Sequence, residues 1–199
     1  MAKANNPKAA KTARIYLILT ILFTLSTCVW AGFRIFHAIQ FDLGCGAFLK
    51  RASSANTIEL AQVQLQSAID FAENNNLTEG VVSIFLRNPS NDIGFWYQNM
   101  TAANEELLSI PEDASQLERT NVLMKLRESL TDTTSGSSSV TVPDGISIYP
   151  NNVAYFWWSL ISMVGATLFL ILWGIYFEKA TGKKIITTTT TTVQFGKSK

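Results

Sequence analysis

Two long apolar runs without a charged side chain constrain this chain more than any other feature of its sequence. They cover Ile15–Phe33 and Val153–Phe177. As helices they would be about 28 Å and about 37 Å long, against a bilayer hydrocarbon core of about 30 Å. Because a helix satisfies its own backbone hydrogen bonds in lipid, the runs predict two membrane-spanning helices, at residues 15–36 and 153–177.

Charge separates the two ends of the chain from its middle. Residues 34–152 hold seven Lys and Arg against fourteen Asp and Glu, a net charge of −7, whereas the rest holds nine against one, a net charge of +8. Lys and Arg favour the cytoplasmic side of a span. We therefore expect a basic tail at residues 1–14 and a basic Thr-rich tail at residues 178–199 in the cytoplasm. The middle would lie outside, at a plasma membrane or an equivalent internal membrane, and its negative charge argues against nucleic acid as a partner.

Aromatic residues support these boundaries. They gather at both ends of the second run, and Trp and Tyr are enriched at the two interfaces of a bilayer because their rings are amphipathic. The outer group is Tyr155, Phe156, Trp157 and Trp158, and the inner group is Trp173, Tyr176 and Phe177.

The first apolar run has an alternative interpretation as a secretory signal peptide. Basic residues precede it, and Ala31 ends a short segment that resembles a cleavage site. The run continues to Phe33, however, which is longer than the usual apolar core of a signal peptide and favours an uncleaved anchor. A lipoprotein cleavage site before Cys28 fits poorly, because Thr27 precedes the cysteine.

Heptad patterns predict that residues 37–132 form an α-helical domain. A long helix is expected from about Ala47 to Asn74, a second follows an N-cap at Asn91 or Asp92, and a third opens at Ser115 with a capping-box pattern. Two apolar stripes repeat with spacings of three and four. The first is Ile58, Ala61, Leu65, Ala68 and Ala72, widened by Leu60 and Ile69, and the second is Ile93, Trp96, Met100, Ala103, Leu107 and Ile110.

Two segments of this domain are less regular. Gly44 and Gly46 weaken a helix by roughly 1 kcal/mol each, which predicts a kink or hinge beside the first span. The short apolar run Val81–Leu86 fits a strand or a helix equally well, because periodicity does not distinguish them over so few residues.

A linker and an extended turn are expected at residues 133–152. Thr133–Ser139 is polar, and two short apolar pieces, Val140–Val142 and Ile146–Tyr149, flank a Pro-Asp-Gly turn. The predicted fold class is therefore all-α. Two transmembrane helices flank a small extracytoplasmic helical bundle, and a short hairpin-like extended segment precedes the second span.

The titratable and nucleophilic side chains form no catalytic pattern. His37 is the single histidine and lies at the edge of the first span, so we interpret it as an interfacial polar residue, with a pH sensor as the alternative. About 25 Å of helix would separate Cys28 from Cys45, which excludes a disulfide between them unless the helix breaks at Gly44, and two cysteines alone do not form a structural zinc site. We expect no catalytic residue, no metal site and no cofactor.

Three residues are candidates for interaction with a partner. Trp96 belongs to the second apolar stripe, so its neighbours Phe95 and Tyr97 point away from it and are available to a partner or to lipid headgroups. Cys45 lies just outside the first span, where an intermolecular disulfide or palmitoylation is the alternative to a free thiol. Small residues spaced four apart within the spans, such as Ser162 and Ala166, would allow close helix packing.

The order of these segments resembles the sensory half of bacterial chemoreceptors: a basic tail, a span, an extracytoplasmic helical domain with heptad seams, and a second span. Chemoreceptors continue into a long cytoplasmic signalling module, whereas 22 residues follow Phe177 here. A sensory role would therefore need a separate cytoplasmic effector. The segments Leu49–Leu60 and Asp92–Tyr97 are also similar to two-span bacterial membrane proteins without an assigned function, cyanobacterial ones among them.

These features predict an integral membrane binding or scaffolding protein whose external helical domain recognises a partner. Its expected partners are membrane lipid and either another protein or a second copy of the chain. A sensory subunit that passes ligand binding to a cytoplasmic effector is the alternative. A membrane enzyme is the third hypothesis, which the lack of a nucleophile or metal set disfavours.

Overall fold

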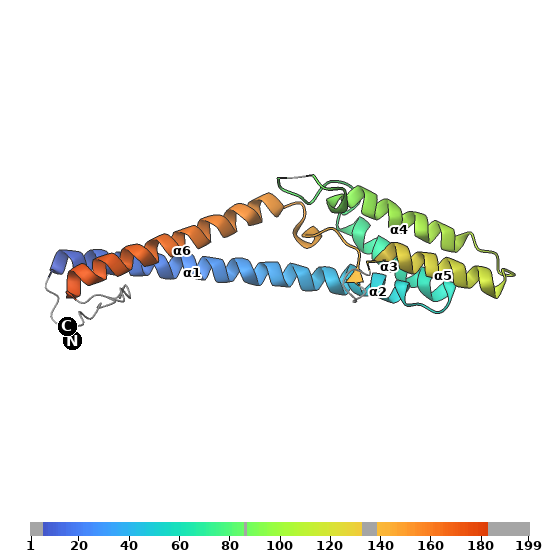
Figure 1. Ribbon diagram of the computed structural model, residues 1–199, viewed down its shortest axis with the longest axis horizontal. Helices are drawn as coiled ribbons and strands as arrows, with labels where there is room; N and C mark the ends of the chain where they lie inside the picture. The colour runs from blue at the N-terminus through green and yellow to red at the C-terminus, as the bar shows by residue number, and fades with distance from the viewer. Residues whose placement is uncertain (1–5, 86, 133–138, 183–199) are drawn as a thin grey trace, which may run out of the picture. The chain divides into compact units, whose positions relative to one another are not determined.

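The computed structural model describes residues 6–85, 87–132 and 139–182, and these are mostly helical (Figure 1), which confirms the predicted all-α class at this level. Two of the helices are long and apolar enough to cross a membrane. The helices are α1 (Pro7–Phe41), α2 (Ala47–Ser53), α3 (Ile58–Asn74), α4 (Ile93–Leu108), α5 (Gln116–Leu130) and α6 (Asn152–Thr181), with strands β1 (Thr131–Asp132) and β2 (Ser139–Val140) and the short helical turns η1 (Asp42–Gly46), η2 (Pro89–Asn91) and η4 (Ile146–Ile148).

The chain divides into two compact units. The helix-pair unit comprises the described residues of Met1–Trp30 and Trp158–Lys199, and the bundle unit comprises those of Ala31–Trp157. Helix α1 extends beyond the predicted residues 15–36 at both ends, and α6 contains all of the predicted residues 153–177.

Aromatic rings pack the two helices of the helix-pair unit against each other. The ring of Tyr16 stacks on Phe169 at a centroid distance of 6.2 Å, and Phe23 meets the same Phe169 ring at 5.4 Å. Phe23 lies directly over Gly165, where an added Cβ would lie 2.3 Å from the ring. A glycine at this position is therefore what lets the phenyl ring approach the backbone of α6.

Polar side chains also join α1 to α6 in the helix-pair unit. The hydroxyl groups of Ser26 and Ser162 lie 2.9 Å apart, and the indole N–H of Trp158 donates to the Ser26 oxygen at 2.9 Å. Ser162 thus takes part in helix packing, as its small size predicted. Cys28, by contrast, is exposed. The Phe23 ring approaches the backbone of α6 at Gly165, which the spacing-of-four pattern did not single out.

The core of the bundle unit forms where α2, α3, α4 and α5 pack together. All five residues of the first predicted stripe are buried, and so is Ile69, but Leu60 is 57% exposed, so its predicted place in the stripe is wrong. At about 100° per residue, Leu60 lies roughly 120° from the centre of the stripe and Ile69 only about 60°. The second stripe is confirmed: Ile93, Trp96, Met100 and Leu107 are buried, and Ala103 and Ile110 pack partly buried against them.

The single helix expected over Ala47–Asn74 is instead two helices, α2 and α3. Near the end of α2, the hydroxyl groups of Ser53 and Ser54 each donate to the carbonyl of Lys50 at 2.9 Å. The Thr57 side chain then accepts the N–H of Leu60 and caps the start of α3. Short hydroxyl side chains compete for backbone groups in this way, which is why they break a helical pattern that the apolar residues alone would continue.

The predicted kink at Gly44 and Gly46 is a π-helical turn, η1, through which the helical path continues from α1 into α2. Because glycine has no Cβ, both glycines allow another side chain to lie close to the backbone there. A Cβ on Gly44 would lie 2.1 Å from the ring of Phe71, and one on Gly46 would lie 2.7 Å from the carboxylate of Asp42.

The hairpin-like segment before α6 differs from the predicted one. Strands β1 and β2 pair antiparallel, with Thr131 opposite Val140, and the N–H of Thr141 donates to the carbonyl of Leu130 at 2.9 Å. Residues Ile146–Ile148, expected to be extended, form the turn η4, because Gly145 adopts a left-handed φ of 87° and directs Ile146 and Ile148 into buried positions. Most of the predicted linker, residues 133–138, and the end of the Thr-rich tail, residues 183–199, lie outside the described residues.

Candidate binding surface of the helical bundle

The first turn of α4 fixes the directions of its aromatic residues. Asp92 caps the helix by accepting the N–H of Phe95 at 3.0 Å, which satisfies a backbone donor that the helix itself leaves unpaired. Trp96 is then buried, whereas the side chain of Phe95 is 60% exposed. The structure therefore places Phe95 on the surface of the bundle unit, as its position beside the apolar stripe predicted.

Tyr97 is more firmly held by the bundle than Phe95 is. It is half-buried against the core, and its hydroxyl donates to the carboxylate of Glu73 on α3 at 2.6 Å. This hydrogen bond raises the pKa of Tyr97, because the phenolate would lose the donated proton and face a carboxylate. Tyr97 thus links α4 to α3, and the structure does not bring it beside Phe95.

Cys45 lies in the core and not on a surface. Its side chain is 0% exposed, and its Sγ atom lies 3.9 Å from the carbonyl oxygen of Ala68. Burial raises the pKa of the Cys45 thiol to about 12, so the nucleophilic thiolate is scarce at neutral pH. In this fold Cys45 offers no thiol for a disulfide between copies or for a lipid chain.

Phe95 stands at the rim of a hollow of about 460 Å³, which we call the Phe95 hollow. Its walls come from the start of α4, the end of α5 and residues 139–144. Every charged residue that lines it is acidic: Asp92, Asp132 and Asp144. The apolar lining consists of Pro89, Phe95, Trp96, Met100, Leu130, Val140, Val142 and Pro143.

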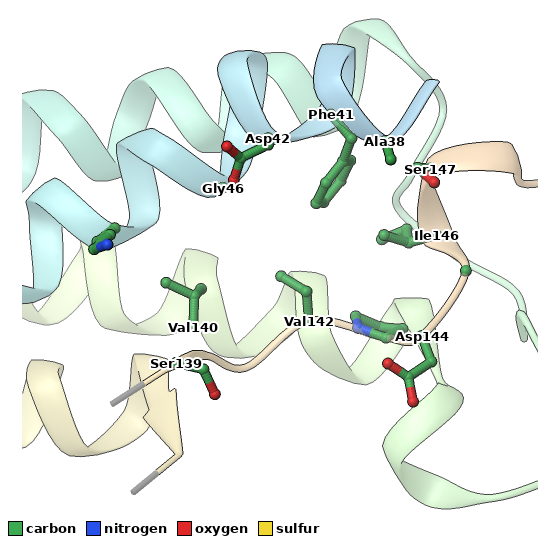
Figure 2. Close-up of a pocket in the computed structure, with 13 residues that line it drawn as sticks. Ala38, Phe41, Asp42, Gly46, Ser139, Val140, Val142, Asp144, Ile146 and Ser147 are labelled. Carbon is green, nitrogen blue, oxygen red and sulfur yellow. The ribbon is translucent and has the colours of Figure 1, made fainter. Parts of the chain in front are cut away.

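A second hollow of about 460 Å³, the Asp42 hollow, also uses residues 139–144. Figure 2 shows the ring of Phe41 pointing into it from the helix, the carboxylate of Asp42 lying beside Gly46, and Val140 and Val142 on the facing segment. Residues 139–144 therefore line two hollows. The Thr141 bond to Leu130 described above holds the segment against the end of α5.

The sequence showed that this segment precedes α6, but not that it lines two hollows. Residues 139–144 lead through η4 to the start of α6, where the side-chain amide of Asn152 donates to the carbonyl of Gly145 at 2.9 Å. The alternation of Val140 and Val142 signalled an extended segment. It carried no information on what the segment lies against, because that depends on α2, α4 and α5.

In the part of the chain that the structure describes, no group of three or more His, Cys, Asp and Glu side chains is placed to hold a metal ion. The ring of His37 lies edge-on to the ring of Tyr155 at 6.2 Å, a contact between aromatic neighbours of the bundle unit.

Comparisons with protein-family models, with curated proteins and with solved structures found no match for this chain. The function is therefore inferred from the residues and their geometry.

Proposed function

We propose that this chain is an integral membrane binding or scaffolding protein whose helical bundle recognises a partner protein outside the cytoplasm. The observation that carries the proposal is the Phe95 hollow, where an exposed aromatic ring stands beside an apolar concave surface. Aromatic side chains at such surfaces dominate binding energy in protein interfaces. The acidic lining favours a partner segment that combines an apolar side chain with Lys or Arg.

The membrane part of the proposal rests on exposure. The most apolar window of α1 has none of its residues buried, and that of α6 has 11% buried. A core helix of a soluble protein would be buried over such a window. Because the apolar faces of α1 and α6 are uncovered, a lipid bilayer is the environment that would shield them from water. The basic ends favour a cytoplasmic position for both termini.

The membrane proposal predicts that the full chain stays in the membrane pellet after alkaline carbonate extraction. Protease added to the extracytoplasmic face should then cleave the middle of the chain and leave both ends intact. An epitope tag at each end and one in the loop before α5 report the three regions. Release into the soluble fraction, or protection of the middle region, would contradict the proposal, and a mature chain that lacks residues 1–31 would support the signal-peptide alternative.

Recognition through the Phe95 hollow predicts a position-dependent cross-link. A photoreactive phenylalanine analogue at position 95 of the full chain should give one discrete adduct in native membranes. The matched control is Leu108, which lies on the same helix and is 62% exposed but does not line the hollow. Adducts of equal yield at both positions, or none at position 95, would refute the proposal. An adduct of twice the chain mass would identify a second copy as the partner.

A sensory role is the second candidate function, and residues 139–144 favour it. They line both hollows and lead to α6, so a ligand that fills either hollow would contact the segment next to the second long helix. The same cross-linking experiment separates the two functions. A stoichiometric extracytoplasmic protein at position 95 supports the scaffold, whereas co-purification with a cytoplasmic kinase or regulator supports the sensor.

A further inference from the structure

An exposed aromatic side chain of the bundle unit lies against the aromatic group at the start of α6. Phe85 is 72% exposed, yet its ring meets the ring of Phe156 edge-on at a centroid distance of 5.0 Å. Phe156 in turn contacts Trp157 at 5.5 Å, and Trp157 is 51% exposed. The two outer rings, Phe85 and Trp157, thus leave much of their apolar surface uncovered, while Phe156 between them is partly buried.

The loop that carries Phe85 is fixed at its base. Val82 donates its N–H to the carbonyl of Asn91 at 3.0 Å, and Ile93 donates to the carbonyl of Gly80 at 2.9 Å. Val82 and Ile93 are buried in the core of the bundle. The position of Phe85 is therefore set by the start of α4 on one side and by the Phe156 ring on the other.

The charge of this loop suits an approach to lipid headgroups. Residues 80–91 contain no Asp or Glu, although the bundle around them is acidic, and their single charged residue is Arg87, which is exposed. Basic side chains near a bilayer are attracted to anionic headgroups, and aromatic rings partition into the interfacial layer.

We propose that Phe85 inserts into the headgroup layer at the extracytoplasmic face and forms, with Phe156 and Trp157, a third attachment of the bundle to the membrane. The inference rests on the proposed membrane location of α6. In that location Phe156 and Trp157 belong to the aromatic group at the outer interface. Phe85 contacts Phe156 directly, so its exposed ring lies at the same depth. The Val81–Leu86 run then has a function: Val82 anchors it in the core while Phe85 meets the lipid.

Spin-label accessibility tests this insertion in the full chain, reconstituted into phosphatidylcholine vesicles with phosphatidylglycerol. Single labels are placed through Phe85→Cys, Phe95→Cys and Leu25→Cys in a Cys28→Ser background, and the unsubstituted background chain measures any label on Cys45. Phe95 is the matched control, because it is also an exposed phenylalanine of the bundle but does not contact Phe156. Collision with apolar oxygen is compared with collision with a water-soluble nickel chelate.

We expect oxygen to outcompete the nickel chelate at position 85 and the reverse at position 95. If the label at position 85 has the same accessibility to the two reagents as the label at position 95, the insertion is overturned. A label at position 85 that neither reagent reaches would also overturn it, because that label would be packed against the chain. Leu25, more than half exposed on α1, separates the two proposals. An aqueous label at position 25 would reject the membrane location, whereas an apolar label there with an aqueous one at position 85 would reject the insertion alone.

Discussion

Replacement of Leu65 by alanine will destabilise the bundle unit by about 2–5 kcal/mol, the usual cost of removing a fully buried leucine side chain. Leu65 is 0% exposed at the centre of α3. The substitution removes apolar contacts and leaves a cavity that the surrounding helices fill only partly. Because the stability of a small domain is itself of the order of 5–15 kcal/mol, this is a large fraction of the total.

The buried thiol of Cys45 provides the measurement. In a Cys28→Ser background, Cys45 reacts with a thiol reagent only when the bundle opens, so its labelling rate reports the opening equilibrium. The Leu65→Ala variant should label roughly 30-fold to about 4,000-fold faster, since about 1.4 kcal/mol is a tenfold change. Leu60→Ala on the same helix is the control, because Leu60 is exposed, and its rate should change little. Similar rates for both variants would show that α3 does not bury the face described here.

Replacement of Gly165 by leucine will disrupt the packing of α1 against α6. A Cβ at this position would lie 2.3 Å from the ring of Phe23. Because the Phe23 ring also packs against Phe169, it has little room to move away. Overpacking of this kind costs about 1–3 kcal/mol. Gly174→Leu is the matched control on the same helix, because no atom lies within 4 Å of a Cβ there.

A disulfide between Ser26→Cys and Ser162→Cys measures this packing, since their hydroxyl oxygens lie 2.9 Å apart. Under mild oxidation the pair should cross-link in the parent chain and in the Gly174→Leu variant, and much less in the Gly165→Leu variant. Adding Phe23→Ala to the Gly165→Leu variant should restore the cross-link by making room for the new side chain. Equal yields in both glycine variants would show that Gly165 does not face α1.

Local patterns in the sequence determined the elements of this protein. Two uncharged apolar runs predicted the two long helices, and spacings of three and four predicted the buried faces of α3 and α4. The cap candidates, Asn91 or Asp92 for α4 and Ser115 for α5, predicted where these helices begin, and Asp92 and Ser115 are the caps. Each of these signals lies within a few helical turns of the chain. They depend on the 3.6-residue period and on unpaired backbone groups at helix ends, so a single sequence carries them.

Contacts between distant segments were decided by the tertiary structure. The burial of Cys45, the placement of residues 139–144 between two hollows, and the contact of Phe85 with Phe156 all join residues far apart in the chain. Of the predicted interaction residues, Phe95 was recognisable because its exposure follows from the helix period. Cys45 was not, because its burial depends on α3, whose approach to the π-helical turn no local pattern records.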